Sequence, residues 1–375
     1  MRTPVYPLFI DLCKLFAESY WQWAVCFLQI VVTIVSFFTL GRIAESIIGN
    51  RKVSFWICTF YLLWPANICY ALTIGTETLS VSGMIFLIWN LIKLNESTKL
   101  TKYWILSSAL VLVLIFLRPI FIYLPFILAV YGLVIAYRRK LTFRKILFGL
   151  IPVIAIFVAV GCYVKEMNRE CGIHGLTIIS THNNFYLTRE ANLLCPELST
   201  DSVITAHLNT FQNTDLHPDI YTQVVEANDL LHTRHYAGYE SYVNQVLKNH
   251  KDAFIKRMIS RFSTEISQQS AFASTTEAFP KFFMKLQALF SFPIPLYFIL
   301  CLVILVMAIR QWRKYGIMPL YVVTFLAISV GITIVSIIGA NSDYGRLMAP
   351  GIPAFLLALG EFLSKFSYNK TKQFL

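Results

Sequence analysis

Long apolar runs separated by short polar connections dominate this chain. A helix needs roughly 17–25 residues to cross a bilayer. Nine runs reach or approach that length: residues 20–40, 53–72, 76–93, 102–117, 119–137, 146–164, 292–310, 317–338 and 347–364. Pro65 lies inside the second run and Pro119 begins the fifth, where proline predicts a kink or a break. The pattern therefore predicts an all-α polytopic membrane protein with about nine transmembrane helices.

The predicted spans form two groups around one long polar segment. Residues 20–164 hold an N-terminal bundle of six spans, and residues 291–364 hold a C-terminal bundle of three. Between them, residues 165–290 are predicted to form a mostly helical loop domain. Residues 1–19 are interpreted as the remnant of a first outer loop, and residues 365–375 as a tail. Of the 375 residues 57% are hydrophobic and only 14% charged, a balance that no ordinary soluble domain has.

Lysine and arginine gather in alternate connections between the predicted spans. These are Arg42, Arg51 and Lys52; Lys93, Lys99 and Lys102; Arg138, Arg139, Lys140, Arg144 and Lys145; Arg310, Arg313 and Lys314; and Lys365, Lys370 and Lys372. The short connections on the other side hold only Arg118 and Arg346. Because cytoplasmic loops carry the excess of positive charge, the basic side is predicted to be cytoplasmic. The net charge of +12 thus indicates membrane topology and not nucleic-acid binding. We expect a multi-pass plasma (inner) membrane protein whose long loop is extracytoplasmic.

This topology puts the N-terminus outside. Residues 1–19 contain neither a signal peptide nor a span. A first span that runs inward usually follows an earlier helix, so we expect a further transmembrane segment upstream. The alternative is a natural protein with an outside N-terminus.

The long polar segment carries all seven histidines. Its last third, Tyr236–Phe272, has helical periodicity with basic and apolar residues interleaved. It is either an amphipathic helix on the bilayer surface or an ordinary helix of an extracytoplasmic subdomain. His232 and His235 could bind a metal, although a polar surface is the favoured interpretation. Cys171 and Cys195 could pair if this segment faces an oxidising compartment.

Three arginines share one context, a proline close behind at the edge of an apolar run. They are Arg2, Arg118 and Arg346. Ionisable groups at membrane depth are costly and suggest function, and the arginine fork suits phosphate. Helix breaks at the prolines also expose backbone N–H groups that bind anions. We predict that the three arginines bind the phosphate of a lipid-linked donor such as a polyprenyl-phosphate sugar. Snorkelling to lipid headgroups is the alternative for each one.

Further polar residues are expected near the same boundary. Asp11 and Glu77 are candidate catalytic acids, although Glu77 begins a helix and could simply interact with its dipole. Asp343 is either the ion-pair partner of a nearby arginine or a group aimed at substrate or metal. His182 could line the outer mouth and touch a sugar, or lie in a turn. Tyr6, Glu77, His182 and Asp343 are thus the predicted substrate-proximal residues.

In order and sidedness these motifs resemble those of bacterial GT-C glycosyltransferases. That group includes protein O-mannosyltransferase-like and aminoarabinose-transferase-like proteins. The similar stretches are Arg2–Phe9, Trp64–Tyr70 with Thr76–Leu79, Leu117–Pro119, and Arg346–Pro350 with Pro353. The resemblance covers residues 1 to about 165 and about 292 to 364, whereas the long loop matches only loosely.

The resemblance implies a GT-C-like bundle that transfers a sugar from a polyprenyl-phosphate donor to a glycan, lipid or protein acceptor outside the cytoplasm. It implies donor-phosphate binding by the three arginines and no certain cofactor, with a divalent metal as an optional aid. The family's base is an Asp upstream of the first motif, a region absent here. Asp11 and Glu77 remain as candidates, Glu77 more as a structural or binding residue, and the chain as given is expected to be impaired.

Two other functions stay open. A polysaccharide polymerase of the O-antigen type also has many spans, but it usually concentrates its arginines in a large outer loop. A lipid or glycan transporter predicts ionisable residues near mid-helix and an internal two-fold repeat, and the sequence shows neither. A nucleotide-driven pump and a serine hydrolase are not supported, because their motifs do not appear.

Overall fold

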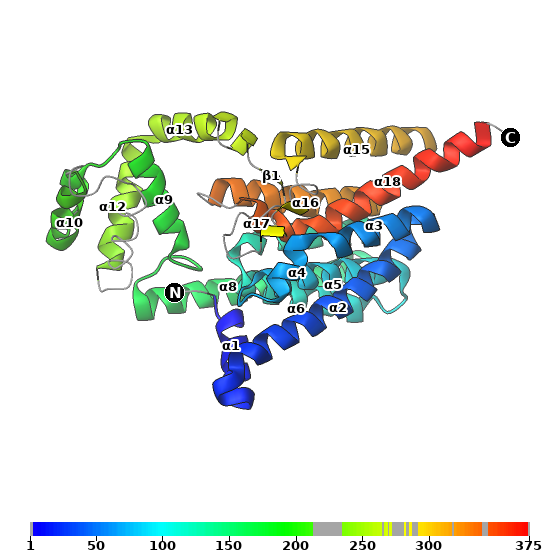
Figure 1. Cartoon of the computed structure of the whole chain (residues 1–375), viewed down its shortest axis with the longest axis horizontal. Coiled ribbons are helices and arrows are strands. Elements are labelled where there is room, and N and C mark those ends of the chain that lie inside the picture. Colours follow the sequence, from blue (N-terminus) through cyan, green and yellow to red (C-terminus); the bar gives the residue numbers. More distant parts are fainter. Residues whose placement is uncertain are drawn as a thin grey trace. The chain divides into compact units, whose positions relative to one another are not determined.

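The computed structural model describes residues 3–212, 235–264, 266–268, 270–271, 281–282, 285–286, 292–316, 319–339 and 344–373. The chain divides into two compact units (Figure 1). The first, here called the bundle unit, consists of Pro4–Ile156, Gln269–Ile338 and Asp343–Leu375. The second, here called the loop unit, consists of Met1–Thr3, Phe157–Gln268 and Gly339–Ser342.

Both units are built almost wholly from helices. The bundle unit contains α1 (Val5–Ala17), η1 (Glu18–Tyr20), α2 (Trp21–Ile48), α3 (Arg51–Leu63), α4 (Pro65–Ala71), α5 (Glu77–Glu96), α6 (Leu100–Leu117), η2 (Pro119–Tyr123), α7 (Leu124–Arg138), α15 (Ile294–Tyr315), α16 (Leu320–Gly339), α17 (Tyr344–Met348), η5 (Ala349–Gly351) and α18 (Ile352–Gln373). The loop unit contains α9 (Ile179–Glu190), η3 (Pro196–Leu198), α10 (Ser202–Gln212), α12 (Tyr236–Asn249), α13 (Lys251–Thr264) and η4 (Ile266–Gln268). Helix α8 (Phe143–Cys171) begins in the bundle unit and ends in the loop unit. Two short strands, β1 (Ser270–Ala271) and β2 (Phe292–Pro293), pair antiparallel.

Within the described residues, eight helical segments are long and apolar enough to cross a membrane, or nine if the bent pair α3–α4 is one span. The prediction of an all-α, multi-pass membrane protein is therefore confirmed. The first segment is longer than predicted, because Val5–Ile48 qualifies as one stretch of 44 residues. Both predicted proline breaks are present: α3 and α4 meet at 51° at Pro65, and α6 ends just before Pro119.

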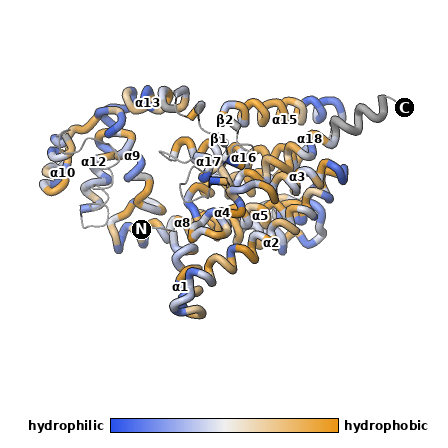
Figure 2. Tube along the Cα trace, viewed as in Figure 1, coloured by the Kyte–Doolittle hydropathy of each residue, from blue (hydrophilic) through white to orange (hydrophobic). Residues whose placement is uncertain are grey.

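Two spans form the centre of the bundle unit. The apolar window of α5 is 72% buried and that of Tyr344–Ser364 is 78% buried, against 22% for Val5–Ile48. Helix α5 packs against α2 and α6, and α18 packs against α2, α3 and α5. Large apolar residues such as Trp23 and Phe27 on α2 are exposed, as expected of a face turned to lipid. Figure 2 shows that the helices of the bundle unit are mostly hydrophobic along their length.

Glycines allow the central helices to approach closely. A Cβ atom on Gly83 of α5 would lie 2.8 Å from Leu114 Cδ2 on α6. A Cβ atom on Gly360 of α18 would lie 2.6 Å from Ile48 Cδ1 on α2. Helices in lipid associate through such close packing, because no hydrophobic effect drives them together.

The loop unit has a hydrophobic core of its own. Residues of α9, α10 and α12 form it, with Phe185 and Tyr239 in ring contact at 5.2 Å between centroids. The helix predicted over Tyr236–Phe272 is two helices, since α12 ends before His250, whose backbone leaves helical geometry. Helix α12 is an ordinary core helix, whereas α13 has the amphipathic character. Cys171 and Cys195 are both free thiols.

A carboxylate ties α10 to α12 inside the loop unit. Asp201 Oδ1 caps α10, accepting from the backbone N–H of Val203 at 2.9 Å and of Ile204 at 3.3 Å. Asp201 Oδ2 lies 2.7 Å from His235 Nδ1 at the start of α12. The hydrogen bond with His235, followed by those of the cap, lowers the pKa of the Asp201 carboxyl.

Replacing Asp201 separates its two interactions. Asp201→Ala loses the cap, costing about 1 kcal/mol, together with the charged contact. Asp201→Asn keeps a good cap and loses only the charge, so we expect it to unfold at a temperature between Asp201→Ala and the native protein. Thermal unfolding in detergent at pH 7 measures this order.

The same pair predicts a pH dependence. Because the folded-state pKa lies below the ordinary 3.8, the pair stabilises the fold above that value. The advantage over Asp201→Asn should disappear as the pH falls through the lowered pKa. Equal unfolding temperatures at pH 7 would contradict a stabilising Asp201–His235 pair.

Candidate functional site

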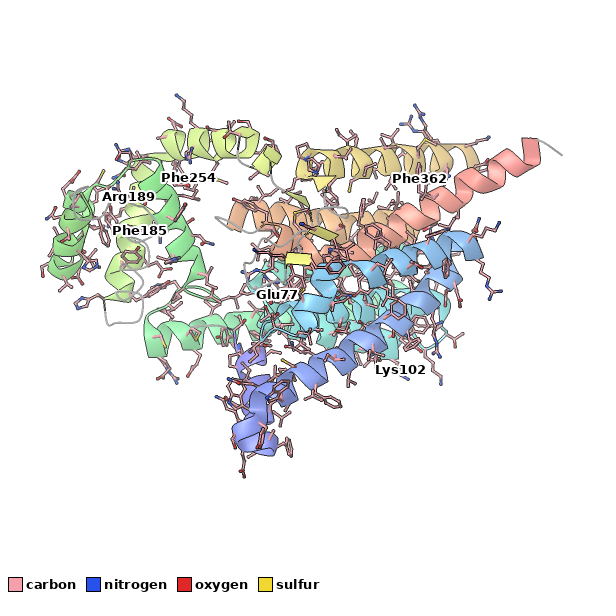
Figure 3. The ribbon with its side chains drawn as sticks, viewed as in Figure 1. Glu77, Lys102, Phe185, Arg189, Phe254 and Phe362 are labelled. Atoms are coloured by element: carbon pink, nitrogen blue, oxygen red, sulfur yellow. The ribbon has the colours of Figure 1, made fainter. Side chains whose placement is uncertain are left out.

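Glu77 belongs to the candidate polar site of the bundle unit. It is the first residue of α5 and is 7% exposed, in the interior of the bundle (Figure 3). Its carboxylate folds back over Gly75, where an added Cβ would lie only 2.4 Å from Glu77 Oε2. A helix N-terminus favours an acidic side chain, so α5 itself contributes to holding the charge.

Arg118 enters the site because of the proline that follows it. The residue before a proline avoids helical geometry. Arg118 accordingly ends α6 with an extended backbone, φ −149° and ψ 123°, while its N–H still bonds to Leu114 O at 2.8 Å. The turn leaves Arg118 only 9% exposed. A long cationic side chain is thereby directed into the bundle and not along the lipid face.

Arg346 reaches the same carboxylate from the C-terminal part of the chain. It lies on α17, the five-residue helix before η5 and α18. Its Nε atom is 3.7 Å from Glu77 Oε1, and Arg118 Nη1 is 3.9 Å from the same oxygen. We call Glu77, Arg118 and Arg346 the arginine–glutamate cluster. Two of the three predicted phosphate-binding arginines thus meet, although they lie far apart in the sequence.

The geometry of the cluster suits it to bind an anion. Both contacts are longer than the 2.7–2.9 Å of charge-assisted hydrogen bonds. The cluster contains two guanidinium groups, which suit phosphate through their charge and their fork of donors. Arg346 keeps 40% of its side chain exposed, so the cluster is open on that side. A phosphate could approach the Arg346 guanidinium group from there.

Gln29 is a polar residue of this region that the sequence analysis missed. It is completely buried in α2. Its side-chain Nε2 donates to the carbonyl oxygens of Tyr70, Ala71 and Thr73 at 3.3, 3.3 and 2.7 Å. The last carbonyls of a helix have no partner within it, so Gln29 satisfies the end of α4 and the loop that leads to Glu77. A lone glutamine inside a long apolar run was the signal available in the sequence.

Two other predicted residues lie on α1. Tyr6 is 3% exposed and donates its hydroxyl hydrogen bond to Gln29 Oε1 at 3.2 Å. Through Gln29 it therefore supports the loop that leads to Glu77. Asp11 is exposed and forms an ion pair with Lys14 at 3.3 Å. Two further predicted residues, Arg2 and Asp343, lie outside the described residues.

The predicted histidine His182 belongs to the loop unit. It lies on α9, and burial lowers the pKa of its imidazole below the ordinary 6.5. The adjacent Asn183 donates a hydrogen bond to Gly339 O. Of the two histidines considered as metal ligands, His235 bonds to Asp201, and His232 lies outside the described residues. Within the described part of the chain, no three His, Cys, Asp or Glu side chains come together as a metal site.

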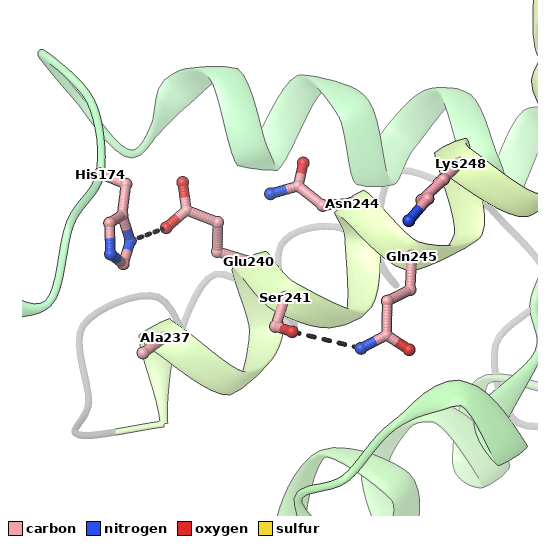
Figure 4. A pocket seen from close by; sticks show the side chains of 7 residues that line it. All are labelled: His174, Ala237, Glu240, Ser241, Asn244, Gln245 and Lys248. Carbon is pink, nitrogen blue, oxygen red and sulfur yellow. Dashed lines mark hydrogen bonds and ion pairs between the residues drawn. The ribbon is translucent and has the colours of Figure 1, made fainter.

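One face of α12 forms a polar pocket of about 340 Å³ (Figure 4). Its polar lining consists of His174, Glu240, Ser241, Asn244, Gln245 and Lys248. His174 Nδ1 lies 2.8 Å from Glu240 Oε2, and Gln245 Nε2 donates to Ser241 Oγ at 3.3 Å. Such groups can bond to a hydroxyl-rich or charged ligand.

The fold and the apolar helices define a multi-pass helical membrane protein. Neither protein-family models, curated proteins nor solved structures give a match to this chain. The arginine–glutamate cluster is therefore the main evidence for its function.

Removing the Gln29 amide should loosen the support behind Glu77. Gln29→Leu removes the donor from three carbonyl oxygens. Tyr70 O still accepts from the Thr73 N–H and hydroxyl, but a buried carbonyl left unsatisfied costs about 1–3 kcal/mol. We expect a marked fall in the unfolding temperature in detergent. Tyr6→Phe removes only the hydrogen bond donated to Gln29 and should have a smaller effect. A Gln29→Leu protein as stable as the native one would exclude this supporting role.

Proposed function

We propose that this protein is a GT-C-type glycosyltransferase that transfers a sugar from a polyprenyl-phosphate donor to an acceptor outside the cytoplasm. The observation that carries the proposal is the convergence of Arg118 and Arg346 on Glu77 where the ends of α5, α6 and α17 meet. The donor has a phosphate for the arginines and a hydrocarbon tail for the surrounding lipid.

The two arginines would bind the donor phosphate and stabilise it as it leaves. Arg118 is mostly buried, so its attraction for an anion is weakened little by water. Arg346 is more exposed and would meet the phosphate first. Negative charge grows on that phosphate in the transition state, where prearranged cations are most effective. Glu77 would act as the counter-ion that holds both arginines apart and in place until the donor arrives.

In the proposed reaction, an acceptor hydroxyl or amine attacks the anomeric carbon of the sugar. The bond from that carbon to the phosphate oxygen breaks, and its electron pair leaves with the polyprenyl phosphate. The nucleophile loses its proton to a general base. We do not assign this base to Glu77, which is occupied by two arginines, or to Asp11, which is paired with Lys14. A divalent metal could assist the leaving phosphate, and the proposal requires none.

The loop unit and the basic connections also have roles in the proposed function. The plasma membrane is the proposed location, with the loop unit outside the cytoplasm and the basic connections inside. The polar pocket on α12 would then face the compartment of the acceptor, a glycan, lipid or protein. Its histidine, carboxylate and amides suit hydroxyl groups better than an apolar partner.

Binding of the lipid phosphate should depend on both arginines. Hydrogen bonds to charged groups contribute about 1.5–3 kcal/mol, so Arg118→Ala and Arg346→Ala should each weaken binding about 10- to 100-fold. Arg118→Lys keeps the charge without the fork and should fall in between. Titration of the purified protein with polyprenyl phosphate measures the affinity.

Two controls make this measurement specific. Arg42→Ala removes an exposed arginine of α2 and should leave the affinity unchanged. Polyprenol without phosphate should bind weakly and equally to all variants. Unchanged phosphate affinity in both cluster variants would refute the proposed phosphate site.

Neutralising Glu77 should make the protein depend on its ligand. Glu77→Gln leaves the buried Arg118 without its carboxylate, and breaking a buried pair costs on the order of 3 kcal/mol. A bound phosphate would restore the missing negative charge. Polyprenyl phosphate should therefore raise the unfolding temperature more in Glu77→Gln than in the native protein. An equal or smaller rise would show that the phosphate does not bind at these arginines.

A further inference from the structure

Helix α13 of the loop unit has an exposed apolar stripe. Ile255, Ile259 and Phe262 are 54%, 64% and 48% exposed. Their spacing of four and three residues puts them on one side of the helix. Three large apolar residues in a row on a solvent-facing helix are not explained by the core of the loop unit, which α9, α10 and α12 complete.

The opposite side of α13 holds the helix to the loop unit. Arg257 Nη2 lies 3.5 Å from Glu190 Oε2 at the end of α9. At 3.6 residues per turn, Arg257 is on nearly the opposite side of the helix from the stripe. Phe254 and Met258 are partly buried beside it. The contact with α9 therefore fixes which way the stripe faces.

The charge of α13 indicates what covers the stripe. The helix carries Lys251, Lys256, Arg257 and Arg261 against a single acidic residue, Asp252. Lys251 and Lys256 are exposed. A polar, basic helix with apolar residues on one side is typical of helices that lie in the interface of an anionic bilayer. A second protein surface would need an acidic face to match.

Chain continuity brings this helix to a membrane. The main segment of the loop unit, Phe157–Gln268, begins within α8, a candidate span. After Gln268 the chain returns to the bundle unit and reaches α15, another candidate span. A unit connected to membrane spans on both sides remains close to the bilayer, so the stripe has lipid within reach.

From these observations we infer that α13 lies on the surface of an anionic bilayer, with Ile255, Ile259 and Phe262 inserted among the lipids. Lys251 and Lys256 contact lipid phosphates. Helix α13 is then an anchor that attaches the loop unit to the membrane at a point separate from α8. This inference does not depend on the proposed transferase activity.

A fluorescent amino acid tests the inference in the full-length protein. A dansyl side chain is introduced by codon suppression at Ile259, and in a matched protein at the neighbouring exposed Ser260. Both proteins are reconstituted in vesicles of phosphatidylethanolamine and phosphatidylglycerol. Doxyl-labelled lipid should quench residue 259 about two- to threefold more than residue 260, because apolar faces insert about 5–10 Å into the interface. Iodide in the water should show the reverse order.

Two further results decide between lipid and protein as the partner. In vesicles of phosphatidylcholine alone, or after Lys251→Gln and Lys256→Gln, quenching of residue 259 by lipid should fall. Equal quenching of residues 259 and 260 by lipid would overturn the inference. Protection of residue 259 from both quenchers would also overturn it, since the stripe would then be covered by a second copy of the chain.

Discussion

One carboxylate determines how the polar interior of this membrane protein is arranged. Glu77 lies between two arginines that are far apart in the sequence; Glu77 and Arg118 are almost wholly buried, whereas Arg346 is partly exposed. The ends of α5, α6 and α17 must therefore come together for the bundle to form at all. Because lipid does not solvate charge, this requirement restricts the arrangement of these helix ends in addition to their apolar packing.

The surrounding residues position these three charged side chains next to one another. Pro119 turns Arg118 inward, Gly75 makes room for the Glu77 carboxylate, and Gln29 holds the end of α4. All three act on backbone that is not helical. In a bilayer such backbone persists only where other groups satisfy its N–H and C=O, and here it occurs next to the cluster. The irregular segments and the charges thus depend on each other.

The sequence allowed the membrane class, most spans and both proline breaks to be predicted, because apolar length and proline act locally. The shared position of Arg118 and Arg346 could also be predicted from the charge pattern. Their common contact with Glu77 could not, since nothing local indicates which carboxylate two distant arginines will meet. The division between α12 and α13 at His250 likewise depends on tertiary packing, because core contacts hold α12 while α13 continues along another surface.

Gln29 has one further consequence. Its single amide nitrogen, with two hydrogens, lies within hydrogen-bond distance of three carbonyl oxygens, so rotation of this one side chain would release all three contacts together. The end of α4 and the loop before Glu77 should therefore open as one cooperative step or remain closed.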